Sequence, residues 1–309
     1  MKKFKKVLVG LFAILLAVVA TACSNKSNSS KDGYTPKSLT IQFVPSQAAN
    51  KLEARAKPLE KMLSKKLGIP VHVSMSTDYN TVVEAMKSKK VDVGFLPPDG
   101  YVLAHKQGAA NVLLQAQRYG VKQPGGQATK NLVNSYRGEI LVKKGSKIKS
   151  WKDLKGKSIS VQNPTSSAGY VFPVAELEEK GLNVPKDCKL VTVTGHDQAV
   201  LNVLNGDTDA AFVFEDARNT VKKDNPKIMD QVVPIYFTKP IPNDTISVRS
   251  DMSKSFQKKL AKAFIEVGES KKGKKIIESI YSHEGYTKSK DSNFDIVRKY
   301  DKIIAKDKK

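Results

Sequence analysis

The chain has 309 residues, 40% of them apolar, which is enough for two domains with buried cores. Lysine and arginine number 53 against 30 acidic residues, so the formal net charge is +23. The lysines are spread along the chain without the interleaved aromatic residues of a base-stacking surface, which argues against nucleic-acid binding. An exported protein beside an anionic membrane can carry such an excess for solubility and attraction.

The N-terminus is organised like a lipoprotein secretion signal. Four lysines fall within residues 1–6, residues 7–22 carry no charge, and Cys23 follows the small residues Thr21 and Ala22. A basic start, an apolar middle and small residues before the cut are typical of a secretory signal. The cysteine at its end resembles a lipoprotein cleavage site, although Ala20 stands where such sites usually carry leucine. We therefore expect cleavage before Cys23 and attachment of a palmitate-type lipid to its thiol.

Two alternatives to the lipoprotein signal stay open. The segment could be an ordinary secretory signal with a chance cysteine, or a retained anchor, although its apolar run is short for a membrane span. Residues 24–37 are polar and lack apolar periodicity, which predicts a flexible tether. Cys188 is the only other cysteine, so we expect no disulfide framework and a small, buried role for Cys188.

The first half of the body alternates strands with helices. The pattern predicts strands at 38–45, 71–75 and 91–96 and helices at 48–67 and from about 78. Pro97 and Pro98 end the third strand. Strands that alternate with helices favour a mostly parallel sheet covered by helices on its faces.

The same order restarts in the second half. Strands are expected at 157–161, 189–193 and 209–214, with helices at about 167–180 and from His196. Asp92 lies 13 residues after Tyr79, and Asp209 lies 13 residues after His196, so the two halves match in spacing as well as in order. Tyr79 and His196 then open equivalent helices beside the carboxyl ends of strands, where open α/β sheets bind ligands.

Two extended runs, 136–142 and 242–248, are the natural crossings between two lobes. The helical segment that follows has an apolar stripe and is expected to pack back on the first lobe; the stripe consists of Phe256, Leu260, Phe264 and Val267. The predicted organisation is a signal peptide at 1–22, a tether at 23–37, a first lobe of 38–136 plus 245–309, and a second lobe of 137–244. Lobes joined in this way close on a ligand by rotation about the two crossings.

Residues 162–170 form the stretch with the clearest chemical character. They read Gln-Asn-Pro-Thr-Ser-Ser-Ala-Gly-Tyr and lie between a predicted strand and the start of its helix. Unpaired N–H groups and a partial positive charge at a helix N-terminus favour an anion, and the hydroxyls of Ser166 and Ser167 add donors. We expect this loop to hold a small oxyanion. Serine and threonine are also common N-caps, so a capped helix without a ligand is the alternative.

With these motifs in place, residues 39–300 resemble the substrate-binding proteins of ABC importers for phosphonate, phosphite and phosphate-like oxyanions. The motifs that carry the resemblance are Asp78-Tyr79 and the stretches 164–170, 195–197, 214–216 and 242–244. The resemblance implies an α/β, two-lobe, periplasmic-binding-protein-like fold of type II. It also implies that Tyr79, Ser166, Ser167 and His196 hold the phosphonate oxygens.

The resemblance further implies that Glu215 and Asp244 face the organic end of the ligand and pair with the amine of an aminoalkylphosphonate. A carboxylate close to the phosphonate would repel it, whereas convergent donors would stabilise its oxygens. These two acids therefore favour an aminoalkylphosphonate over phosphate or phosphite. Leu96 stands near a position that is often tyrosine in the family, so either the pocket is more apolar there or Tyr101 substitutes. Asp99 and Asp216 are expected to be helix caps.

The predicted protein is a lipid-anchored, extracytoplasmic and monomeric solute-binding protein at a Gram-positive type of cell membrane. It would deliver its ligand to an ABC permease and its ATPase, without a cofactor or metal. A lipoprotein that senses the ligand for a membrane kinase, or a binding protein for phosphite or phosphate, is the alternative. An enzyme is disfavoured, because Ser166, His196 and Asp244 lack a nucleophile elbow and the histidines have no metal-site spacing.

Overall fold

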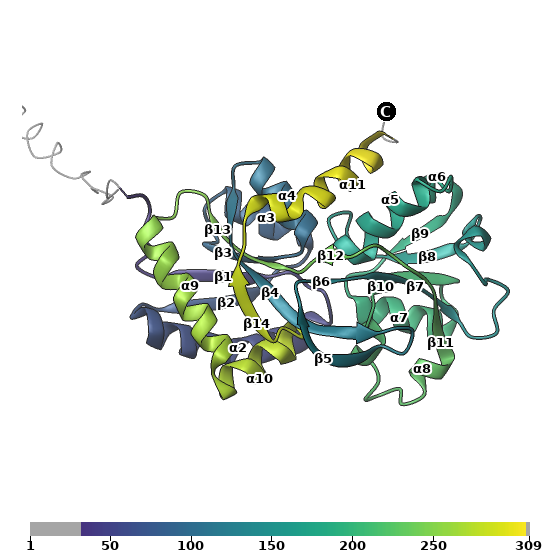
Figure 1. Ribbon diagram of the computed structural model, residues 1–309, viewed down its shortest axis with the longest axis horizontal. Coiled ribbons are helices and arrows are strands. Elements are labelled where there is room, and N and C mark those ends of the chain that lie inside the picture. Colours follow the sequence, from purple (N-terminus) through teal and green to yellow (C-terminus); the bar gives the residue numbers. More distant parts are fainter. Residues whose placement is uncertain (1–31, 307–309) are drawn as a thin grey trace, which may run out of the picture.

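The structure is a computed structural model that describes residues 32–306 (Figure 1). The predicted signal peptide and the lipidation residue Cys23 lie outside the described residues. The end of the predicted tether is held against the body, since Tyr34 forms a β-bridge with Met252 and its ring centroid lies 3.8 Å from the guanidinium carbon of Arg249. The packed part of the chain thus begins before Ser38. Between residues 32 and 306, no helix combines the length and the hydrophobicity needed to cross a membrane.

The first lobe is built on a mixed sheet in the order β14-β4-β13-β3-β1-β2, with β5 paired to β4. The pairs β1–β2 and β1–β3 are parallel and the others are antiparallel. The strands are β1 (Leu39–Phe43), β2 (Val71–Met75), β3 (Val93–Leu96), β4 (Ala110–Lys122), β5 (Gln127–Val133), β13 (Thr245–Arg249) and β14 (Gly285–Lys288).

Helices cover both faces of this sheet (Figure 1). One face carries α2 (Ala49–Leu67), α9 (Lys254–Glu269) and α10 (Lys271–Tyr281), and the other carries α3 (Tyr79–Lys87) and α4 (Pro98–Lys106). The apolar stripe predicted for the segment after the second crossing is confirmed, because its four residues are buried on α9.

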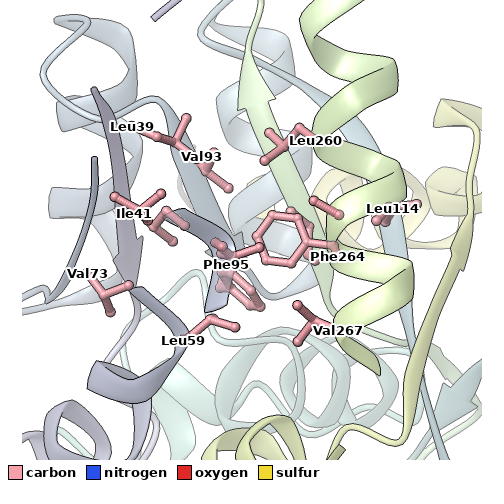
Figure 2. Close-up of a cluster of buried hydrophobic side chains, with 14 of the residues drawn as sticks. Leu39, Ile41, Leu59, Val73, Val93, Phe95, Leu114, Leu260, Phe264 and Val267 are labelled. Carbon is pink, nitrogen blue, oxygen red and sulfur yellow. The ribbon is translucent and has the colours of Figure 1, made fainter. Parts of the chain in front are cut away.

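The core of the first lobe centres on Phe95 of β3. Its ring stacks on Phe43 at 4.1 Å between centroids and meets Phe264 edge-on at 5.7 Å. Figure 2 shows Phe264 and Val267 on one side of Phe95, with Leu59 of α2 on the other. This packing fixes the sheet against α2 and α9, so the carboxyl ends of β1 and β3 are held in place.

The second lobe has a sheet in the order β11-β7-β10-β8-β9. Its strands are β7 (Gly138–Lys143), β8 (Ser158–Val161), β9 (Lys189–Thr192), β10 (Ala210–Phe214) and β11 (Val232–Phe237). Its helices are α5 (Phe172–Glu178), α6 (Val184–Asp187), α7 (His196–Asn205) and α8 (Ile228–Gln231). The predicted α/β two-lobe class is confirmed. The sheets are mixed rather than mostly parallel, because β7 and β13, the strands that follow the crossings, run antiparallel to their neighbours.

The internal repeat extends to individual hydrogen bonds. In the first lobe, Asp92 accepts from the N–H and the hydroxyl of Thr40, each at 2.9 Å, and donates its own N–H back to that hydroxyl. In the second lobe, Asp209 makes the same three bonds with Ser158. The two halves therefore tie the start of their first strand to the start of their third strand in the same way.

Several connections join the lobes. The crossings lie side by side, since β6 (Ser135–Tyr136) pairs antiparallel with β12 (Ile241–Pro242). The hairpin of β4 and β5 reaches from the first sheet along the second lobe (Figure 1). Helix α11 (Asp295–Lys306) also touches both lobes, because it packs on α4 and α5 and Tyr300 donates to Glu176 at 3.1 Å. The lobe boundaries predicted from the sequence stay a prediction.

Candidate ligand-binding site

A cavity of about 60 Å³ lies between the lobes. Five of the six predicted binding residues line it. Tyr79 comes from the first lobe, Ser166, Ser167 and His196 come from the second, and Asp244 lies on the second crossing. The structure therefore brings together residues that lie up to 165 positions apart, from Tyr79 to Asp244. Whether they bind a ligand stays a prediction.

The serine loop, residues 162–170, is held by hydrogen bonds within the loop. Ser166 caps the following turn by accepting from the N–H of Gly169 at 3.3 Å, and the N–H of Gln162 bonds to the carbonyl of Gly169. A Cβ at position 169 would stand 1.6 Å from the side-chain oxygen of Gln162, so a larger residue there would have to displace this buried side chain. The helix expected at 167–180 begins as a π-helical turn, Ser167–Val171, before α5. Pro173 has no N–H with which to continue a regular ladder into that turn.

Tyr79 is placed by a capped helix start. Asp78 is the N-cap of α3 and accepts from the N–H of Thr81 at 2.9 Å, which fixes the first turn. The Tyr79 side chain is 3% exposed, and burial raises the pKa of its phenol, against the opposing effect of its hydrogen bond with Ser166. The phenol therefore keeps its proton at neutral pH and is available as a donor.

His196 opens α7 and is buried at the cavity wall. Its ring centroid lies 4.7 Å from that of Phe214, and its Nδ1 has no hydrogen-bond partner within residues 32–306. Burial lowers the pKa of the imidazole to about 3. The ring is thus neutral at physiological pH and offers one N–H donor and one acceptor nitrogen, rather than two donors.

The two acids expected at the organic end are separated. Asp244 lines the cavity, with Oδ2 at 3.7 Å from Nε2 of His283. Glu215 lines a different hollow, of about 350 Å³. Of the residues that line this hollow, Tyr136 alone also lines the cavity. The carboxylate of Glu215 accepts from Nε2 of Gln123 at 2.7 Å and from the N–H of Arg137 at 3.1 Å, and burial raises its pKa. The expectation that Glu215 and Asp244 face one ligand end together does not fit this placement.

Sequence reasoning missed three large polar side chains of the cavity, which are Arg118, Tyr136 and Tyr281. It offered Tyr101 as a substitute for the tyrosine absent near Leu96, but Tyr101 lies elsewhere: its hydroxyl donates to Asp291 at 2.7 Å and its ring packs on Phe294. The two additional tyrosines come instead from β6 and α10. A strand assignment for residues 110–122 would have raised Arg118 as a candidate.

Of the two acids expected to be caps, Asp216 stands at the N-cap position of the 3₁₀ turn Ala217–Thr220, whereas Asp99 lies inside the first turn of α4. Asp216 makes no side-chain cap bond and instead accepts from Arg118, with Nη2 at 2.6 and 2.7 Å from its two oxygens. Asp99 is buried beneath the serine loop; its N–H donates to Ser167 at 3.3 Å, and burial raises the pKa of its carboxyl well above the usual range. Within residues 32–306, no cluster of histidine, cysteine and acidic side chains could hold a metal ion.

The lobes are closed around the cavity. The N–H of Ala48 donates to Asp197 at 3.1 Å, and the hydroxyl of Thr165 lies 3.1 Å from the side-chain oxygen of Asn80. Each of these bonds joins the first lobe to the second. The cavity is therefore a feature of the closed arrangement, in which donors from both sides converge.

The chain is similar to known proteins in sequence and in fold. A family model described as "ABC transporter, phosphonate, periplasmic substrate-binding protein" matches residues 41–294. The Phosphate-import protein PhnD of Mycolicibacterium smegmatis is 30% identical over 213 residues, which are 66% of this chain and 64% of that protein, so the match spans slightly less than two thirds of that relative. The Phosphonates-binding periplasmic protein of Escherichia coli is 23% identical over 248 residues, 79% of this chain and 70% of that protein.

Among solved structures, PhnD1 from Prochlorococcus marinus in complex with methylphosphonate has a TM-score of 0.74 and 19% identity. The likeness covers 88% of this chain and 100% of that chain. At this level of identity the likeness supports the fold, which is that of the two-lobe periplasmic binding proteins.

Proposed function

The chain belongs to the family of periplasmic substrate-binding proteins of phosphonate ABC transporters, and from this membership we propose that it captures a phosphonate or related phosphorus oxyanion between its lobes. It then delivers the ligand to an ABC permease and its ATPase. The observation that supports the proposal is the convergence of hydroxyl groups from both lobes on one cavity; these are the hydroxyls of Tyr79, Ser166 and Ser167.

The chemistry of the cavity suits such an anion. A phosphonate has three acceptor oxygens, and the wall offers hydroxyl donors together with one N–H of the neutral His196. One water needs about 10–15 Å³ of this kind of space, so 60 Å³ holds roughly four to six water-sized groups. A tetrahedral phosphorus centre with three oxygens and one small substituent has that size.

Charged residues of the cavity wall bear on which organic group the ligand carries. An aminoalkylphosphonate was expected from two carboxylates, and Asp244 alone lines the cavity. Arg118 lines it as well and brings a positive charge. The geometry therefore supports a small phosphorus oxyanion without an amine, such as methylphosphonate, phosphite or phosphate, and an aminoalkylphosphonate held by Asp244 is the second candidate.

Lipid anchoring completes the proposal. The order of basic, apolar and small residues before Cys23 supports export and attachment to the outer face of the cell membrane. The anchor would keep the binding protein close to its permease.

Titration calorimetry of the protein against methylphosphonate, phosphite, phosphate and 2-aminoethylphosphonate tests the proposed ligand class. We expect saturable heat with at least one of the three ligands that lack an amine. Absence of heat with all four would contradict the assignment to phosphorus oxyanions.

A further inference from the structure

Arg118 is a charged residue of the cavity whose role the proposed function leaves open. It lies on β4, and its side chain is only 10% exposed although it belongs to the cavity wall. The guanidinium carbon lies 5.6 Å from the ring centroid of Tyr136 and 6.0 Å from that of Phe214. Both rings also line the cavity, so the guanidinium is held between two aromatic walls of the ligand space.

The positive charge of Arg118 is only partly committed to a partner. Its Nη2 bonds to both oxygens of Asp216, which follows β10 in the second lobe and does not line the cavity. Its Nε has no hydrogen-bond partner within the described part of the chain. Burial disfavours the charged guanidinium, but the carboxylates of Asp216, Glu215 and Asp244 outweigh this and raise its pKa. Arg118 therefore stays a cation at the cavity wall.

This cation changes how the acids around the cavity act on a ligand. Glu215 and Asp216 lie outside the cavity, and Asp216 is neutralised by the direct ion pair. Asp244 is the one carboxylate among the lining residues, and it has His283 beside it as well as the field of Arg118. A ligand ammonium placed near Asp244 would meet the repulsion of Arg118 at low dielectric. An oxygen acceptor or a small uncharged group would not.

We propose that Arg118 is a ligand-binding residue that sets the charge preference of the cavity. It admits phosphorus oxyanions whose fourth substituent is uncharged or carries an acceptor oxygen, and it rejects those whose substituent ends in an ammonium group. This inference rests on the proposed function, because it names the ligand class of the same cavity. The ion pair with Asp216 holds the guanidinium in place, and the aromatic rings exclude water from it.

The test compares two opposite changes of charge in the full chain. Arg118→Gln removes the cation and keeps an amide donor, whereas Asp216→Asn keeps the cation and removes its neutralising partner. Calorimetry gives the affinity ratio of methylphosphonate to 2-aminoethylphosphonate for wild type and for each variant. We expect a wild-type ratio of about tenfold or more, a fall of about tenfold in Arg118→Gln and a rise in Asp216→Asn, tenfold being about 1.4 kcal/mol.

A purely structural ion pair gives a different result. Each variant breaks the same link between the lobes, so a link alone would weaken all ligands together and move the ratio in neither direction. Ratios that stay at the wild-type value in both variants, or that move the same way in both, would overturn the inference, as would a wild-type preference for 2-aminoethylphosphonate. Since Asp216→Asn leaves every cavity residue in place, its affinity ratio tests the inference even if Arg118→Gln folds poorly. If the wild-type protein bound none of these phosphorus oxyanions, that result would contradict the proposed function and, with it, the inference.

Discussion

The backbone N–H of His196 donates a hydrogen bond of 2.9 Å to the carbonyl oxygen of Ser46, and both residues line the cavity. The bond joins the second lobe to the first at the ligand space itself. A ligand that holds the hydroxyls on both sides therefore stabilises the same closed arrangement as this bond does. Ligand capture and lobe closure are expected to be thermodynamically coupled.

Weakening the closed state should reduce affinity without touching the cavity. Asp197→Ala removes the acceptor of the Ala48 N–H, which joins the lobes outside the cavity lining. We expect the affinity for every ligand to fall by the same factor, corresponding to about 0.5–1.5 kcal/mol. Calorimetry measures the affinity, with Asp207→Ala in the exposed turn after α7 as the control. A selective loss for one ligand would mean that Asp197 contacts the ligand instead.

The serine loop should carry a large part of the oxyanion contacts. Ser167→Ala is expected to weaken binding by about 1–3 kcal/mol, because an oxygen of the ligand then loses its charged hydrogen bond. Thr192→Ala, which removes an exposed hydroxyl at the end of the neighbouring strand β9, is the control and should leave affinity unchanged. Wild-type affinity in the double variant Ser166→Ala, Ser167→Ala would contradict the assignment of this loop as the oxyanion-binding site.

His196 should make the fold less stable in acid. Burial places its folded-state pKa at about 3, below the value of about 6.5 in the unfolded chain, so the unfolded chain binds a proton that the folded protein excludes. Stability is therefore lost as pH falls through about 6.5 towards 3, by roughly 2 kcal/mol between pH 7.5 and 5. Denaturant unfolding of wild type and His196→Gln at pH 7.5 and 5 measures this. Equal losses in the two proteins would show that His196 is not buried as a neutral ring.

The cap of α3 should couple stability to binding. Asp78→Ala removes the acceptor for the N–H of Thr81 and is expected to cost about 0.5–2 kcal/mol of stability. Affinity should fall as well, because Tyr79 is the next residue and loses its fixed direction. Ser270→Ala removes the equivalent cap of α10, away from the cavity, and should cost similar stability at unchanged affinity. The same affinity in both variants would show that Tyr79 does not contact the ligand.

Membrane attachment should depend on one thiol. Cys23→Ser removes the proposed lipidation site and is expected to release the protein from the membrane fraction into the medium. Fractionation of cells that express wild type or the variant measures this. A variant that stays in the membrane fraction would point to a retained signal helix.

Much of the fold could be predicted from local patterns in the sequence. The repeat spacing that paired Tyr79 with His196 corresponds to two helices that open at the same cavity, with matching bonds of Asp92 to Thr40 and of Asp209 to Ser158. Such features depend on residues close in sequence or on periodicity. They could therefore be predicted without knowing which distant segments meet.

What could not be predicted depends on long-range placement. The ion pair of Arg118 joins residues 98 positions apart on two lobes, and nothing near Arg118 in the sequence indicates its partner. Glu215 was placed in the site by the family resemblance, whereas in the structure it lines the adjacent hollow and its neighbour Phe214 lines the cavity. Successive residues of an extended chain point to opposite sides, so Phe214 lines the cavity and Glu215 the adjacent hollow.

The most direct measurement is a crystal structure of the protein grown with methylphosphonate. We predict phosphonate oxygens within hydrogen-bond distance of Ser166, Ser167 and Tyr79, with the lobes closed and the methyl group towards Arg118 and Phe214. A phosphonate seated in the hollow beside Glu215, or a closed and empty cavity at saturating ligand, would contradict the account.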